Sequence, residues 1–158
     1  MAITRLNNNS ITSVTALPSG VGGKVLQVVM GAEDTYTVIN STNYSTLNFD
    51  AQITLSSTSS KVFVQFSGGL EQDDYNGAIG EARLLRDISG GTQGTQLKAY
   101  GVGLDSSENR QPNSYAFTYL DSPNSTAQLT YRLQGKTENS SGDFRSKGGR
   151  IVLMEIGT

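Results

Sequence analysis

The sequence predicts an all-β fold, an antiparallel β-sandwich of the jelly-roll type with an extended N-terminal arm. From Lys24 onward, short apolar segments recur between turn-rich breaks, a pattern typical of sandwiches and not of alternating βα units. Residues 128–134 alternate strictly between apolar and polar side chains, as a strand with one wet face does. Charged residues make up only 16% of the chain, which suits strands with polar, uncharged faces.

The chain is expected to hold one domain, because 158 residues can bury one sizeable core but not two. Residues 1–23 are rich in Asn, Ser, Thr and Gly and have neither a helical nor a strand period, so they are predicted to form the arm. Residues 24–158 are predicted to form the head. The chain contains no Cys, so the head must be stabilised by packing or oligomerisation and not by disulfides.

Strands are predicted wherever apolar and β-branched residues alternate between turn signals. Leu129, Tyr131 and Leu133 share one face of the clearest strand, and two further rows of this kind should supply a layer of the core. These rows are Val62, Val64 and Phe66, and Tyr115, Phe117 and Tyr119. The predicted strands are 24–30, 34–40, 50–55, 61–70, 79–87, 95–103, 113–120, 127–135 and 149–156.

The segment 79–88 fits two structures. Ile79, Ala82, Leu85 and Ile88 have a helical spacing, but glycines bracket the segment and its neighbours are strands. A strand is therefore predicted here.

The last strand is apolar on both faces. Ile151 and Leu153 occupy one face, and Val152, Met154 and Ile156 occupy the other. Burying one such side chain contributes roughly 1.5 to 3 kcal/mol, so neither row is expected to stay in water. The strand is therefore predicted either to lie in the middle of a sheet or to be covered by a neighbouring subunit.

The composition argues against most enzymes. His and Cys are absent, which excludes Ser-His-Asp and Cys-His arrangements and the usual zinc sites. Two acidic groups remain, Glu71 with Asp73 and Asp74, and Asp105 with Glu108. Either could ligate calcium or supply a glycosidase pair, but neither has a known loop spacing, and solvated turns are the simpler interpretation. We expect a non-enzyme with no catalytic residues, no cofactor and no metal.

The charge pattern bears on partners. A net charge of −2 without a long Lys/Arg run argues against nucleic acid. No apolar run approaches the ~20 residues of a membrane-spanning helix, and residues 1–5 do not resemble a signal peptide. Tyr36, Tyr44 or Tyr75 could stack on a sugar ring of a host glycan, although core or interface packing is the commoner role of such rings.

Three segments together resemble virion surface proteins of tailed phages, especially marine and cyanophage-like ones. They are the opening ITSVTALPSG running into GKVLQVV, the stretch SSTSSKV at 56–62, and YLDSP at 119–123, followed by the closing IVLMEI at 151–156. The resemblance implies a jelly-roll head of a capsid decoration, head-fibre or tail-fibre protein, assembled as a homotrimer and attached by its N-terminal segment. The arm's apolar residues are then the candidate particle anchor: Ile3, Leu6, Ile11, Val14 and Leu17.

The leading functional hypothesis is a capsid decoration, cement or head-fibre protein, made in the host cytoplasm and located on the virion. Its expected partners are further copies of itself and the major capsid protein or another virion protein. The alternative is a tail or tail-fibre module that recognises host cell-surface glycan. A third possibility is a glycan hydrolase that uses Glu71, Asp73 or Asp74.

Overall fold

The computed structural model describes residues 24–31, 36–73, 80–91, 93–102, 111–139 and 142–157. These ranges contain nine strands and no helix. The predicted arm, with Ile3, Leu6, Ile11, Val14 and Leu17, lies outside the described residues. The strands are β1 (Lys24–Met30), β2 (Thr37–Ile39), β3 (Ser45–Thr54), β4 (Lys61–Asp73), β5 (Gly80–Ile88), β6 (Thr95–Val102), β7 (Gln111–Asp121), β8 (Gln128–Thr137) and β9 (Asp143–Gly157).

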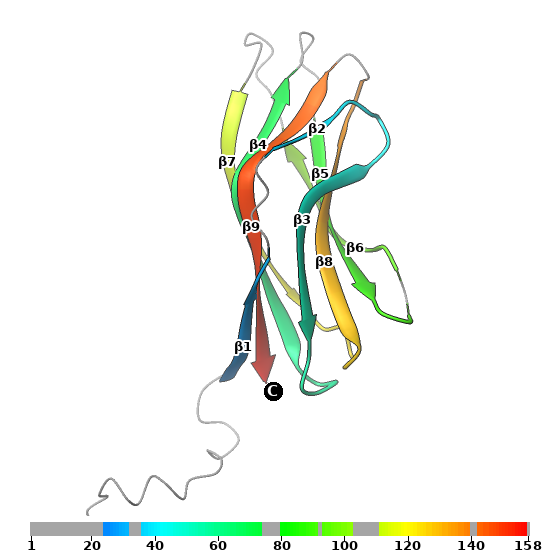
Figure 1. Cartoon of the computed structure of the whole chain (residues 1–158), viewed down its shortest axis with the longest axis vertical. Helices are drawn as coiled ribbons and strands as arrows, with labels where there is room; N and C mark the ends of the chain where they lie inside the picture. Colours follow the sequence, from blue (N-terminus) through cyan, green and yellow to red (C-terminus); the bar gives the residue numbers. More distant parts are fainter. Residues whose placement is uncertain are drawn as a thin grey trace, which may run out of the picture.

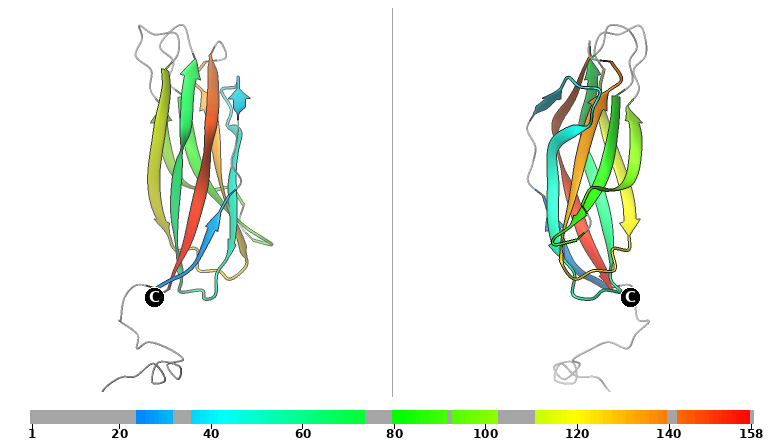
Figure 2. Two further views of the ribbon diagram at one scale, coloured as in Figure 1. Left: turned by 60° about the vertical axis from the view of Figure 1, so that its left-hand side comes forward. Right: turned by 90° about the vertical axis from the view of Figure 1, so that its right-hand side faces the viewer.

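The strands form two antiparallel sheets that face each other, as Figures 1 and 2 show. One sheet has the order β1-β9-β4-β7, with the short β2 also pairing with β9, and the other has the order β3-β8-β5-β6. The pairs β1–β9, β3–β8, β4–β7 and β5–β6 are nested, first strand with last. This nesting is that of a long hairpin rolled into a double-sheet jelly roll. The predicted all-β sandwich is confirmed.

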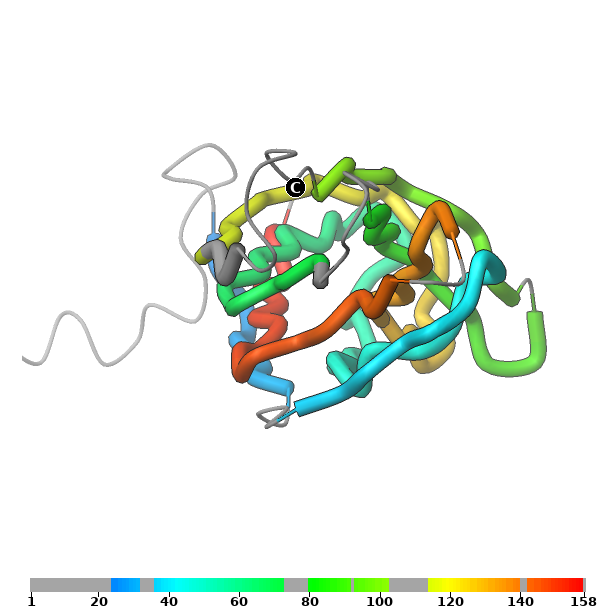
Figure 3. The backbone as a smooth tube through the Cα atoms, turned by 90° about the horizontal axis from the view of Figure 1, so that it is seen from above, coloured from blue at the N-terminus to red at the C-terminus, as the bar shows by residue number. Residues whose placement is uncertain are grey.

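Figure 3 shows the backbones of the two sheets from above, facing each other. The core lies between them and is lined by alternate residues of the strands. The predicted rows on β8 and β4 are fully buried: Leu129, Tyr131, Leu133, Val62, Val64 and Phe66. The row on β7 is only partly buried, because β7 is an edge strand. Its Phe117 stacks on Tyr100 of β6 with ring centroids 4.0 Å apart, so an aromatic pair bridges the two sheets along this side.

The ambiguous segment 79–88 is the strand β5, so the strand prediction there is confirmed. β5 is central in its sheet, paired with β8 on one side and β6 on the other. Its helical spacing of apolar residues has a local cause. Leu84 faces the core, and its neighbour Leu85 is also buried although it points to the other side of the sheet, next to a bulge in β6, so the apolar positions do not follow a simple alternation.

Several strands are longer than predicted. β3 begins at Ser45 and not at residue 50, and β9 begins at Asp143 and not at residue 149. Gly148 and Gly149 both lie inside β9, with positive φ angles of 70° and 147°. They form a β-bulge opposite Gly68, where β9 contains one residue more than the paired stretch of β4.

The bulge reverses which residues of β9 face the core. Phe144 and Ser146 are buried before it, and Ile151, Leu153 and Glu155 are buried after it. Without the extra residue, the alternation of a strand would turn one of these two sets toward solvent. The bulge therefore allows a strand of 15 residues to line the core along its whole length.

We expect Gly149→Ala to lower the free energy of unfolding by more than about 2 kcal/mol. An added Cβ would lie 2.6 Å from both the Cα of Gly68 and the carbonyl oxygen of Ser67, at a φ that L-residues rarely adopt. Gly101→Ala is the matched control, because nothing lies within 4 Å of its added Cβ, and it should change stability by less than about 1 kcal/mol. Urea denaturation of both variants measures the difference, and equal stabilities would contradict the role given to the bulge.

Candidate functional site: the outer face of the five-stranded sheet

The outer side of the β1-β9-β4-β7 sheet carries a continuous row of apolar side chains. The strand registers place Val28 opposite Met154, Met154 opposite Phe63, and Phe63 opposite Leu120, so one row crosses four strands. Val25 with Ile156, and Met30 with Val152, flank this row on β1 and β9. The outer apolar face is defined here as Val25, Val28, Met30, Phe63, Leu120, Val152, Met154 and Ile156.

This face is only partly covered by the chain itself. Val28 and Met30 are each 57% exposed, and Val25 and Leu120 are each 52% exposed. Scattered exposed apolar side chains are ordinary on a soluble protein, but a contiguous set is not. The outer apolar face therefore has the features of a contact surface.

The outer side of the other sheet provides an internal comparison. Its side chains are polar and bind one another: Arg83 donates to Gln134 at 2.7 Å and lies 3.8 Å from the ring centroid of Tyr44, and Lys136 pairs with Glu81 at 3.3 Å. β8 presents the predicted wet face on this side. Only one of the two outer faces is thus suited to water.

The structure separates the two predicted rows of the last strand. Ile151 and Leu153 are fully buried in the core, whereas Val152, Met154 and Ile156 lie on the outer apolar face and are part-exposed. β9 pairs with β1 and β2 along one edge and with β4 along the other.

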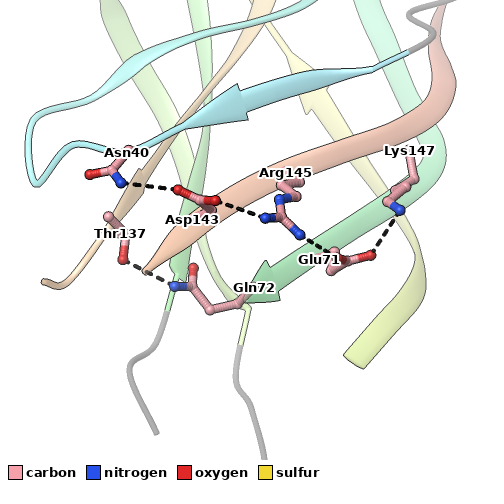
Figure 4. A network of polar contacts seen from close by, with 7 residues as sticks. All are labelled: Asn40, Glu71, Gln72, Thr137, Asp143, Arg145 and Lys147. Atoms are coloured by element: carbon pink, nitrogen blue, oxygen red, sulfur yellow. Dashed lines mark hydrogen bonds and ion pairs between the residues drawn. The ribbon is translucent and has the colours of Figure 1, made fainter. Parts of the chain in front are cut away.

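Of the first acidic group, the structure describes the side chain of Glu71 alone. Glu71 is fully buried and ion-pairs with Arg145 at 3.2 Å and with Lys147 at 3.3 Å (Figure 4). Arg145 also binds Asp143 at 2.7 Å, and Asp143 accepts a hydrogen bond from Asn40. Within this network Glu71 compensates two cations, which is a structural use of the charge.

The other acidic candidates cannot be compared with Glu71. Asp74, Asp105 and Glu108 lie outside the described residues, and only the backbone of Asp73 is described. Among the described residues no group of three or more potential metal ligands gathers. Within the same ranges, no helix has the length and apolar character needed to cross a membrane.

Two of the three tyrosines considered for sugar stacking can be located. Tyr44 is held by a hydrogen bond to Glu81, with Arg83 over its ring. Burial and then this bond to Glu81 raise the pKa of Tyr44 to about 12. Tyr36 is 50% exposed, with the Lys147 ammonium 5.5 Å from its ring centroid. Tyr75 lies outside the described residues.

A shallow hollow adjoins the outer apolar face on the same sheet. It has a volume of about 440 Å³ and lies where glycines of β4 and β9 leave the surface bare. Hydroxyl groups and one ammonium surround it, whereas the ring of Tyr115 packs against the core on the other side of the sheet. Its lining residues are Ser67, Gly68, Gly69, Ser114, Tyr115, Ala116, Lys147 and Gly148.

A buried carboxylate that the sequence analysis missed holds β1 in place. Glu155 is 1% exposed, and its Oε1 accepts hydrogen bonds from the backbone N–H of Ser56 at 2.8 Å and from the Ser56 hydroxyl at 2.6 Å. Its Oε2 accepts a hydrogen bond from Gln27 of β1 at 2.6 Å. The signal was present in the sequence, because Glu155 shares the parity of Ile151 and Leu153.

The hydrogen bonds decide the pKa of Glu155. Burial by itself raises the pKa of a carboxyl group, but the bonds from Ser56, Gln27 and Ser60 outweigh burial and lower the pKa of Glu155 to about 2. The charged form is therefore the one that the fold stabilises.

We expect Glu155→Gln to reduce the free energy of unfolding at pH 7 by about 1.5 to 3 kcal/mol. Because the folded pKa lies below the unfolded value of about 4.3, the carboxylate contributes fully above that value and its contribution is lost as the pH falls toward about 2. The difference between wild type and variant should thus shrink over this window. Urea denaturation at several pH values measures it, with Glu138→Gln, at an exposed carboxylate, as control. A constant difference down to pH 2 would refute the assignment.

Comparisons with known proteins show distant likenesses of fold. No protein-family model matches the chain, and no curated protein matches its sequence. The structure is similar to a chain of the IBDV viral particle (15% identity, TM-score 0.47, 81% of this chain and 30% of that chain). It is similar to a chain of the VP2 subviral particle of infectious bursal disease virus (16% identity, TM-score 0.42, 81% of this chain and 32% of that chain). It is also similar to the enzymatically active domain of tailspike protein 4 of bacteriophage CBA120 (15% identity, TM-score 0.25, 82% of this chain and 18% of that chain). The chain spans about a third or less of these proteins, and likenesses so distant carry no argument about function.

Proposed function

We propose that this protein is a structural component of a virion, a capsid decoration or head-fibre protein that acts by contact as a homotrimer. The observation that carries the proposal is the outer apolar face, a surface built to be covered by protein and not by water. The tailed-phage resemblance supports the virion location and the attachment role of residues 1–23.

The chemistry of the described charged groups agrees with a contact function. The buried carboxylates each bind a cation or several hydrogen-bond donors: Glu71 binds Arg145 and Lys147, Asp121 binds Arg86, Asp87 binds Arg132, and Glu155 binds Ser56 and Gln27. General acid or base catalysis requires a group that can exchange a proton with a substrate. In these arrangements the carboxylates hold strands together instead.

Removal of residues 2–20 tests the attachment role. We expect the shortened chain to keep the fold of its strands, because the described core contains none of the removed residues, and to lose association with particles. The test adds either purified chain to tailed-phage particles that lack this protein and measures co-sedimentation with the particles. Circular dichroism of the shortened chain is the control for folding. Undiminished association of a folded, shortened chain would show that the head itself is the anchor.

The hollow beside the outer apolar face favours a second candidate function, binding of host cell-surface glycan. Its lining combines the hydroxyl groups of Ser67 and Ser114 with the ammonium of Lys147, which suit the polar groups of a sugar. A glycan array probed with the purified chain tests this function. Binding that Ser114→Trp abolishes would favour a receptor-binding module, and no binding to any glycan would leave decoration as the proposal.

A further inference from the structure

The outer apolar face resembles the centre of a protein interface in its anatomy. Strands lie about 4.8 Å apart and rise about 3.3 Å per residue, so a face four strands wide measures roughly 15 by 20 Å. Around the apolar row lie neutral polar side chains such as Gln65, Ser67 and Thr118. An apolar centre with a polar rim is the usual arrangement of a specific interface, which buries about 800 Å² on each partner.

Cations border the outer apolar face at its two ends. Lys24 and Lys61 lie beside Ile156 and Gly157 at one end, and Arg150 contacts Met30 at the other. The row from Val28 to Leu120 contains no charged side chain. A surface that covers this row must therefore be uncharged and apolar too, because a polar group buried against it would lack a hydrogen-bond partner.

Each copy of the chain offers one such surface. Among the described residues, most of the exposed large hydrophobic side chains belong to β1 or to the outer apolar face, so no other described surface is comparably apolar. A face of roughly 300 Å² is smaller than one side of a standard interface, so it fits the centre of a contact whose rim is the surrounding polar sheet. In a closed symmetric assembly every subunit contributes its outer apolar face, and the same contact between subunits occurs at each symmetry-related position.

We infer that the outer apolar face is the surface through which copies of this chain bind one another. In the proposed trimer, on which this inference rests, the three faces meet around the symmetry axis. β1, β9, β4 and β7 of each subunit then line the axis, and the polar outer side of the other sheet stays in water. The part-exposed row of Val152, Met154 and Ile156 is buried by this assembly.

The first experiment measures the mass of the full chain against concentration by sedimentation equilibrium. We expect the wild-type chain to oligomerise and Val28→Asp with Leu120→Asp to raise the dissociation constant about a hundredfold or more, since each buries an unpaired charge. Both side chains are more than half exposed in the single chain, so the variant should fold. The control Gln52→Asp places the same charge on the exposed outer side of β3 and should not change the mass.

A second measurement needs no variant. Met30 and Met154 both lie on the outer apolar face, so their oxidation by dilute peroxide should slow by about tenfold in the oligomer and recover on dilution, with free methionine as the reference. Oxidation that is independent of concentration would overturn the inference. So would an association that weakens in high salt, because contacts through an apolar face with like-charged ends should hold or strengthen when charges are screened.

The outcomes separate this inference from the proposed function. A chain that stays monomeric but binds particles overturns the inference and leaves the decoration role. An oligomer that persists unchanged in the double variant shows that the copies meet elsewhere, and also overturns it. A chain that oligomerises through this face but never binds particles supports the inference and removes the decoration role.

Discussion

The bulge in β9 is the constraint on which the rest of the structure depends. β9 pairs with β1, β2 and β4, so its alternation decides which side chains of the five-stranded sheet face inward. The extra residue at Gly148 and Gly149 changes that alternation halfway along the strand. As a result, Phe144 packs in the core at one end while Leu153 packs there at the other. The same change of phase directs Met154 outward, into line with the apolar residues of β1 and β4.

The buried carboxylate of Glu155 connects this core to the outer apolar face. Its bond to Gln27 joins β1 to β9, and Gln27 also donates to the carbonyl oxygen of Thr54 at the end of β3. β1 is an edge strand with few inward-facing apolar side chains of its own, so these hydrogen bonds contribute much of what holds it against β9 and β3. Because Val28 stands one residue after Gln27, its place in the outer row depends on a charge on the opposite side of the sheet.

The sequence predicted the strands well and the details of the site poorly, for physical reasons. Alternation is a local property, so rows such as Leu129, Tyr131 and Leu133 could be read without knowledge of the fold. The bulge could not be predicted in this way, because a pair of glycines is as typical of a turn as of a bulge. The partners of Glu71 come from residues 145 and 147, far along the chain, and no spacing announces them. The outer apolar face is likewise assembled from four strands, although the two-sided apolar character of 151–156 was visible and pointed to it.

The contrast between the two sheets links the fold to contact as a mode of action. A jelly roll in water needs one apolar side on each sheet, and the β3-β8-β5-β6 sheet has that pattern, with ion pairs and cation–π contacts outside. The β1-β9-β4-β7 sheet has apolar residues on both sides of β9, and the outward row stays part-exposed in the single chain. When another surface covers this half-exposed row of valine, leucine and methionine side chains, their burial stabilises the contact by several times the thermal energy. In the proposed assembly this free energy becomes available when the outer apolar face is covered, and the fold of the single chain does not require it.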